Sequence, residues 1–255
     1  MKATRFTSAL NVVVVGLLLS SATSEALLYF DFQDAPLPLE IPDGRLEGTH
    51  DTRTITAPFD RVVQVEVSIT LAPGSDGAFA GDLYVTLVHE DRMAVLLNRP
   101  GRERSNRFGY GDSGGFSVTL RDDARLGDIH TYQRSQSLGL GGGNSAPLEN
   151  EWQPDGRTAD PTVVTTEDPR TAMLSQFVGT DPNGEWTLFL ADASGGGAVA
   201  LQSWSLQFGF ATVPDTGSTA LASAFATGLV MVMAERHRRW CYRAQAGRHS
   251  EEHRS

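Results

Sequence analysis

Apolar and polar residues alternate along the middle of the chain, and this alternation predicts β-strands. Between Val63 and Leu71 the odd-numbered positions are apolar and the even-numbered positions are polar, as in a strand with one buried face. The same two-residue period recurs at residues 83–87, 116–120, 186–190 and 204–210. No stretch before Ser218 has the apolar period of a helix. We therefore predict an all-β domain, a jelly-roll-like β-sandwich.

Turn-forming residues separate the predicted strands. Clusters of Gly, Pro, Asp, Asn and Ser lie at 73–77, 181–184 and 194–197. The glycine-rich run at 139–143 is predicted to be a flexible loop, because the strands on either side of it are too few to form two cores.

The first 26 residues have the features of a signal peptide. Lys2 and Arg5 precede an apolar run at 9–19, and Ser24 and Ala26 provide a small-x-small cleavage site. The run is shorter than the roughly 20 residues that a membrane span needs. We predict removal of residues 1–26 on export, with a non-cleaved anchor as the alternative.

A second apolar run, at 218–234, contains no charged residue and is followed by Arg236, Arg238 and Arg239. Its length is at the lower limit for a transmembrane helix, and the arginines place the C-terminus in the cytoplasm. A buried helix is the alternative, but the run lacks a polar face. Cys241, the single cysteine, follows the arginines. The exported part therefore has no disulfide and no cysteine-based zinc site.

A short motif stands directly before this helix: Val213, Pro214, Asp215, Thr216 and Gly217. The motif, the apolar helix and the arginines together resemble a sorting signal of the VPDSG variety of the PEP-CTERM class, with Thr in place of Ser and a longer tail. The resemblance implies that residues 213–255 are recognised and cut by a membrane exosortase. A plain C-terminal anchor is the alternative.

The part between the two ends, residues 27–212, is strongly acidic. It holds 26 Asp and Glu against 13 basic residues, a net charge of −13. Such a surface keeps an exported protein soluble and repels phosphate backbones, so we predict no binding to nucleic acid.

Several segments of the acidic domain resemble the P domain (P/Homo B domain) of subtilisin-like proprotein convertases. They are residues 65–70, 81–87, 94–101, 116–124, 152–157, 174–177, 181–188 and 201–206. The resemblance extends over about residues 40–210. It is strongest at an NG-x-W-x-L motif and a W-x-L motif, in which Trp186 and Trp204 are expected to face inward from neighbouring strands.

A catalytic domain is not expected. No segment before residue 40 is long enough to be a subtilisin-like domain. Residues 111–115 spell GDSGG, which surrounds the nucleophile in chymotrypsin-like proteases, but the required His and Asp partners are missing before Ser113. We interpret this motif as a turn. His89 lacks the second histidine of an HExxH zinc motif, and His130 is expected to be exposed in a loop.

Calcium is the candidate cofactor. Asp82 precedes one predicted strand, Asp122 and Asp123 end another, and Asp192 ends a third. If these strand ends meet, the carboxylates could surround a cation that prefers oxygen ligands. The P-domain resemblance also implies that strand-end aspartates can bind calcium. The alternative is that each is an ordinary turn residue.

We conclude from the sequence that this is an exported, non-catalytic interaction or structural module of the cell envelope or extracellular space, anchored transiently or permanently by its C-terminal helix. Its partner would be an extracellular protein or polysaccharide. One alternative is an accessory factor that stabilises a separate subtilisin-like serine protease, and a second is an unrecognised hydrolase.

Overall fold

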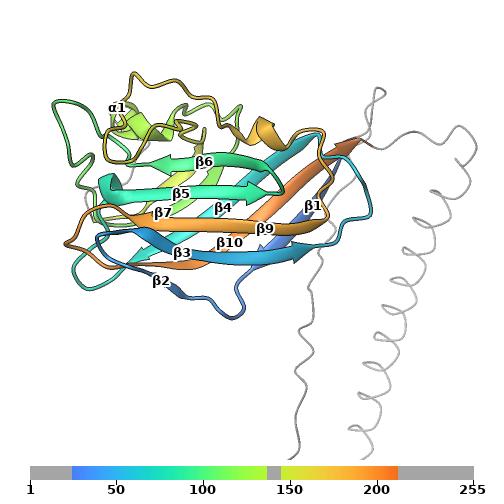
Figure 1. The fold of residues 1–255 in the computed structure, drawn as a ribbon, viewed down its shortest axis with the longest axis horizontal. Coiled ribbons are helices and arrows are strands. Elements are labelled where there is room, and N and C mark those ends of the chain that lie inside the picture. The colour runs from blue at the N-terminus through green and yellow to red at the C-terminus, as the bar shows by residue number, and fades with distance from the viewer. Residues whose placement is uncertain (1–24, 137–144, 212–255) are drawn as a thin grey trace, which may run out of the picture. The chain divides into compact units, whose positions relative to one another are not determined.

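The computed structural model describes residues 25–136 and 145–211 (Figure 1). These residues form strands, one short α-helix and three 3-10 turns. The strands are β1 (Glu25–Phe32), β2 (Leu39–Ile41), β3 (Arg45–Ile55), β4 (Gln64–Pro73), β5 (Leu83–His89), β6 (Arg92–Asn98), β7 (Phe116–Leu120), β8 (Leu148–Trp152), β9 (Gly184–Asp192) and β10 (Val199–Ala211). The helical segments are η1 (Ala80–Asp82), η2 (Ile129–Thr131), α1 (Tyr132–Gln136) and η3 (Leu174–Phe177).

The strands form two sheets that pack face to face as a β-sandwich (Figure 1). One sheet has the order β1-β10-β4-β7-β8, with β2 also paired to β10, and the other has the order β3-β9-β5-β6. All pairs are antiparallel except β7 with β8. The prediction of an all-β domain is confirmed.

The alternating pattern marks strands that face the core between the sheets. In β4, Val65, Val67, Ile69 and Leu71 are buried, and the residues between them are half-buried. Strand β3 was not predicted because its residues are mostly polar. It is an edge strand that pairs only with β9, so few of its side chains are buried. Strand β1 was not predicted either, because its apolar residues directly follow the predicted signal peptide.

Trp186 and Trp204 both face the core, as predicted, and are almost completely buried. Their placement on neighbouring strands was wrong. Trp186 lies on β9, which pairs with β3 and β5, whereas Trp204 lies on β10 in the other sheet. The loop between β9 and β10 crosses from one sheet to the other, so two strands that are adjacent in sequence contribute to the core from opposite sides.

Four of the predicted segments lie wholly or mostly outside the described residues. Among residues 25–136 and 145–211, no helix has the length and apolar character needed to cross a membrane. The helix predicted at 218–234, the motif at 213–217 and the glycine-rich run at 139–143 lie outside the described residues, as does the predicted signal peptide up to residue 24.

Candidate functional site: an arginine pocket

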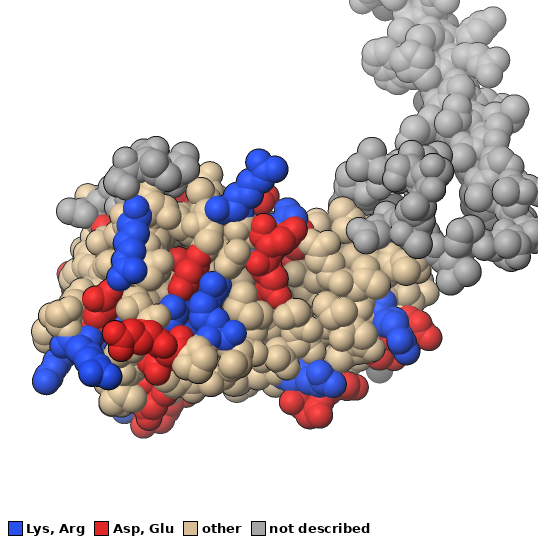
Figure 2. All heavy atoms as spheres, turned by 90° about the horizontal axis from the view of Figure 1, so that it is seen from above, with Lys and Arg blue, Asp and Glu red and all other residues tan. Residues whose placement is uncertain are grey.

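The loop that follows β6 concentrates positive charge. Four of the 13 basic residues of the acidic domain lie within nine positions of this loop. They are Arg99, Arg102, Arg104 and Arg107. Figure 2, which views the molecule from above relative to Figure 1, shows basic side chains interspersed with acidic ones on the face in view.

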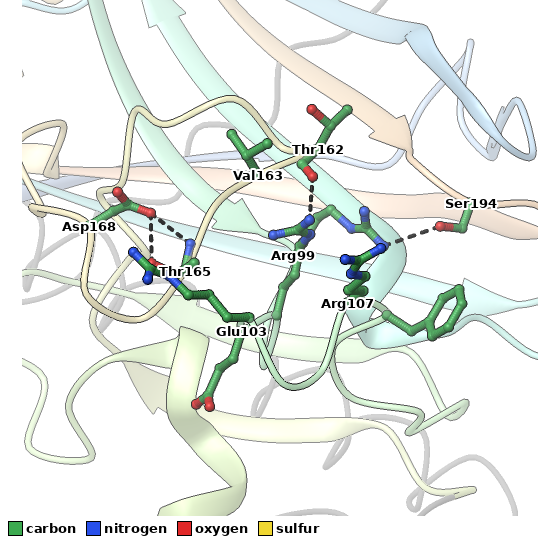
Figure 3. A pocket seen from close by; sticks show the side chains of 11 residues that line it. Arg99, Glu103, Arg107, Thr162, Val163, Thr165, Asp168 and Ser194 are labelled. Atoms are coloured by element: carbon green, nitrogen blue, oxygen red, sulfur yellow. Dashed lines mark hydrogen bonds between the residues drawn. The ribbon is translucent and has the colours of Figure 1, made fainter.

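The arginines line a pocket of about 810 Å³. Its other walls come from the segment 162–168 and from Ser194 in the loop between β9 and β10. Figure 3 shows that Arg99 and Arg107 lie between these two segments, which are far apart in sequence. We call this site the arginine pocket.

Backbone contacts hold the arginine loop in shape. The side-chain amide of Asn106 donates to the carbonyl groups of Gly101, at 3.4 Å, and Gly109, at 2.7 Å. The N–H of Tyr110 donates to the carbonyl of Pro100 at 2.8 Å, which closes the loop. Gly101 has a φ of 78°, and a Cβ there would collide with the ring of Tyr110, so the turn requires glycine.

Arg102 joins the arginine loop to the opposite wall. Its side chain is buried and donates to the carbonyl groups of Val164, at 2.6 Å, and Thr162. Its Nε atom has no hydrogen-bond partner within the described part of the chain. The guanidinium group of Arg102 therefore holds the two walls of the pocket together.

A buried polar network supports the arginine loop from below. His130 was predicted to be exposed, and this prediction was wrong: it is completely buried. Its Nδ1 lies 2.7 Å from a carboxylate oxygen of Asp155, and its Nε2 lies 3.1 Å from the carbonyl of Arg102. Asp155 is also paired with Arg157 at 3.1 Å. A buried carboxylate needs such partners. The contacts with Asp155 and with the carbonyl of Arg102 hold His130 against the inner side of the arginine loop.

The outer part of the pocket is exposed. The side chain of Arg104 is 87% exposed and lies 4.0 Å from Glu167, a separation that contributes little binding energy at a surface. Arg107 is exposed and has no ion pair within residues 25–136 and 145–211. Phe108 and Val163, on opposite walls, are 76% and 63% exposed. The rim thus combines exposed guanidinium groups with apolar side chains.

Arg99 forms the inner end of the pocket, contacts the predicted calcium ligand Asp82 and lies near a second one, Asp192. Its Nη2 lies 3.4 Å from Asp82 and 3.2 Å from the hydroxyl of Ser194. Asp192 lies beside them, because Leu83, the residue after Asp82, pairs with Asp192 between β5 and β9. Burial raises the pKa of Asp82. Burial, with the nearby carboxylates of Asp82 and Asp43, raises the pKa of Asp192 to about 6.

The other two predicted ligands lie at the opposite end of the sandwich. The carboxylate of Asp122 accepts the backbone N–H groups of Leu174 and Ser175 and so caps η3. Asp123 forms an ion pair with Arg121 at 2.7 Å. These aspartates lie next to the Gln64 end of β4, whereas Asp192 leads into β10 at the Pro73 end.

The four aspartates therefore do not fit a single calcium ion. Within residues 25–136 and 145–211, no group of three or more His, Cys, Asp or Glu side chains has the arrangement of a metal site. Near Asp82 and Asp192, the positive charge is supplied by Arg99. Calcium binding by this protein stays a prediction.

The GDSGG motif is built into the sandwich. Asp112 is buried and accepts from the hydroxyl of Tyr132, at 2.5 Å, and from the amide of Gln133, at 2.7 Å. The carbonyl of Ser113 accepts the N–H of Ala78 at 3.1 Å. Gly115 has a φ of 80° and lies against the carbonyl of Leu71. Close backbone packing thus accounts for the final glycines of the motif.

Comparisons with known proteins support part of the resemblance. The sequence model of the proprotein convertase P-domain family matches residues 156–208, which include η3, β9 and most of β10. This part of the chain is similar to a P-domain. A comparison with curated proteins found no match.

One solved structure with partial similarity is the crystal structure of the Aeromonas sobria serine protease in complex with the chaperone ORF2. The sequence identity is 17% and the TM-score is 0.40. The similarity covers 74% of this chain and 27% of that chain. The chain thus spans about a quarter of the length of the protein it matches.

Sequence reasoning missed the arginine pocket. A signal was present, since four arginines within nine residues are unusual in a domain with twice as many acidic as basic side chains. The pattern did not show that residues 162–168 and Ser194 lie opposite these arginines.

Proposed function

We propose that this protein is an exported, non-catalytic, P-domain-like binding module that is displayed at or released from the cell surface. The observation that carries the proposal is the arginine pocket, where exposed guanidinium and apolar groups lie on a rigid loop of an acidic domain. The P-domain match supports the same role. We also infer that the sandwich is a jelly roll, because strands consecutive in sequence repeatedly alternate between the two sheets.

The surroundings of the candidate catalytic groups favour binding over catalysis. Asp112 of the GDSGG motif is bound by Tyr132 and Gln133. Both ring nitrogens of His89 face backbone carbonyls, at 2.9 and 2.7 Å, and His130 is committed to Asp155 and Arg102. A general base needs a free ring nitrogen directed at its nucleophile, and these two imidazoles have none.

Export and anchoring are proposed from the sequence, and the strand bounds are compatible with both. Strand β1 begins at Glu25, which pairs with Ala211 at the end of β10. The predicted cleavage after Ala26 falls two residues into β1, and the predicted cleavage before Ser218 lies outside the described residues. Loss of residues 1–26 would remove only the first two pairs of this ladder, and loss of the tail from Ser218 would remove none of it.

Cell fractionation combined with intact-mass analysis tests the proposal. We expect the chain in the envelope or the medium, without residues 1–26 and without Ser218–Ser255. A chain that retains Arg236–Arg239 at the envelope would leave only the plain anchor. A chain confined to the cytoplasm would contradict the proposed export.

The second candidate function is accessory to a separate subtilisin-like serine protease, and the P-domain match favours it. This role predicts that the purified chain slows thermal inactivation of a subtilisin-like protease from the same producer. Serum albumin at equal concentration is the control for non-specific protection. Equal protection by both proteins would count against this role.

A further inference from the structure

We propose that the arginine pocket binds an acidic peptide segment of a partner protein, in which carboxylate side chains stand next to an apolar side chain. This inference rests on the proposed function, because it names the ligand of the binding module. It concerns the exposed rim formed by Arg104, Arg107, Phe108 and Val163.

The first argument is charge. The guanidinium group is planar and binds carboxylates through two parallel hydrogen bonds. Arg104 and Arg107 carry such groups at the surface with little or no competition from the described residues, since only Glu167 approaches Arg104 and only to 4.0 Å. Arg102 lies behind them with its Nε unpartnered. The lining holds four arginines and two carboxylates, of which Glu103 pairs with Arg134 and Asp168 accepts from Thr165, so its positive charge exceeds its negative charge.

The second argument is the size of the ligand. The domain around the pocket has a net charge of −13, so the attraction is local. Surface charges act over roughly 8 Å at physiological ionic strength. A long polyanion, such as nucleic acid or polyuronate, would extend past the pocket and meet the acidic surface. A short acidic segment would contact the arginines alone.

The third argument is the apolar rim. Phe108 and Val163 are among the most exposed large hydrophobic residues of the described chain, and both line the pocket. Free phosphate would leave them in water. A peptide with a Phe or Leu beside its carboxylates would cover Phe108 and Val163. A Phe ring of the peptide could also stack on the exposed guanidinium groups in a cation–π contact.

The fourth argument is preorganisation. Asn106 fixes the loop between Gly101 and Gly109, and Arg102 ties it to the wall at Thr162 and Val164. A loop that is already ordered loses less conformational entropy on binding. The left-handed backbone at Arg99, with a φ of 51°, fits the same interpretation, because strained non-glycine residues concentrate at binding sites.

Fluorescence anisotropy with the full-length chain in a nonionic detergent tests the proposal. The probe is a fluorescein-labelled peptide of sequence GFEEFG, and the comparison peptides are GFQQFG, without charge, and GSEESG, without aromatic rings. We expect saturable binding of GFEEFG that weakens with added salt, and at least about tenfold weaker binding of each comparison peptide, the effect of losing one good contact of about 1.4 kcal/mol.

Substitutions locate the binding. The double variant Arg104→Ser with Arg107→Ser should weaken GFEEFG binding at least about tenfold. Both side chains are exposed, so the fold is retained, which circular dichroism would verify. The matched control is Arg61→Ser with Arg125→Ser, which removes the same charge from exposed positions outside the pocket and should leave the affinity unchanged.

The proposal is overturned by any of three results: no binding of GFEEFG to the wild type, equal loss of affinity in the control variant, or tighter binding of polygalacturonate or inorganic phosphate than of the peptide. These assays use purified protein. Failure of export would therefore leave them unaffected, and their failure would leave the localisation result standing.

Discussion

Substitution of Asp192 by Asn should stabilise the protein near neutral pH. Asp192 is 3% exposed at the end of β9, and one carboxylate oxygen accepts the N–H of Ser194 at 3.0 Å. Burial, together with Asp82 and Asp43, raises its pKa from 3.8 to about 6. Asn keeps an oxygen acceptor for Ser194 and carries no charge that must be buried.

The raised pKa determines the sign of the effect. Between about pH 4 and pH 6 the folded protein holds a proton that the unfolded chain has already released, so the free energy of unfolding falls as the pH rises through this window. A shift of about two pKa units corresponds to about 3 kcal/mol. Because Arg99 loses a favourable neighbour in the variant, we expect a gain of about 1 to 3 kcal/mol above pH 6 and little change near pH 4.

Urea unfolding of the wild type and Asp192→Asn at about pH 4 and about pH 8 measures the change in the free energy of unfolding at each pH. The control is Asp123→Asn, whose side chain is 70% exposed and whose pKa is lowered by a hydrogen bond from Arg121. Its contribution has the opposite sign, being present at neutral pH and lost as the pH falls, and should stay below about 1 kcal/mol. If Asp192→Asn were less stable than the wild type at about pH 8, the carboxylate would be stabilising and the reasoning would fail.

Three further outcomes follow from the same structure. Trp204→Ala should lower the free energy of unfolding by about 3 to 5 kcal/mol, because it leaves a cavity in the core and removes the 2.6 Å hydrogen bond to buried Asp51. An unchanged melting temperature would contradict the buried position of Trp204. Gly115→Ala should cost more than about 2 kcal/mol, because its Cβ would overlap a carbonyl of β4, whereas Gly111→Ala, with open space around it, should stay within about 0.5 kcal/mol in the same urea assay. If calcium binds at Asp82 and Asp192, millimolar calcium should raise the melting temperature of the wild type and leave that of Asp192→Asn unchanged; an unchanged curve in both proteins would contradict the calcium prediction.

Five of the strands that face the core were predictable from sequence alone. A strand places successive side chains on opposite faces, so burial of one face in β4, β5, β7, β9 and β10 leaves a period of two in the chain itself. The acidic composition and the arginine cluster at 99–107 are also properties of the sequence. Edge strand β3 left no such trace, because its exposed positions are free to be polar.

Only the tertiary structure decided which strand ends meet. Asp82 and Asp192 come together because β5 pairs with β9, and Asp122 and Asp123 do not join them because their strand ends lie at the other end of the sandwich. Nothing in the four aspartates themselves distinguishes the two pairs. The burial of His130 likewise depends on tertiary structure, because its partner Asp155 lies 25 residues away in the sequence. Side-chain alternation depends on local backbone geometry. The composition of a site depends on contacts between distant segments, and these contacts are determined by the order of the strands in the sheets and by the loops that cross between sheets.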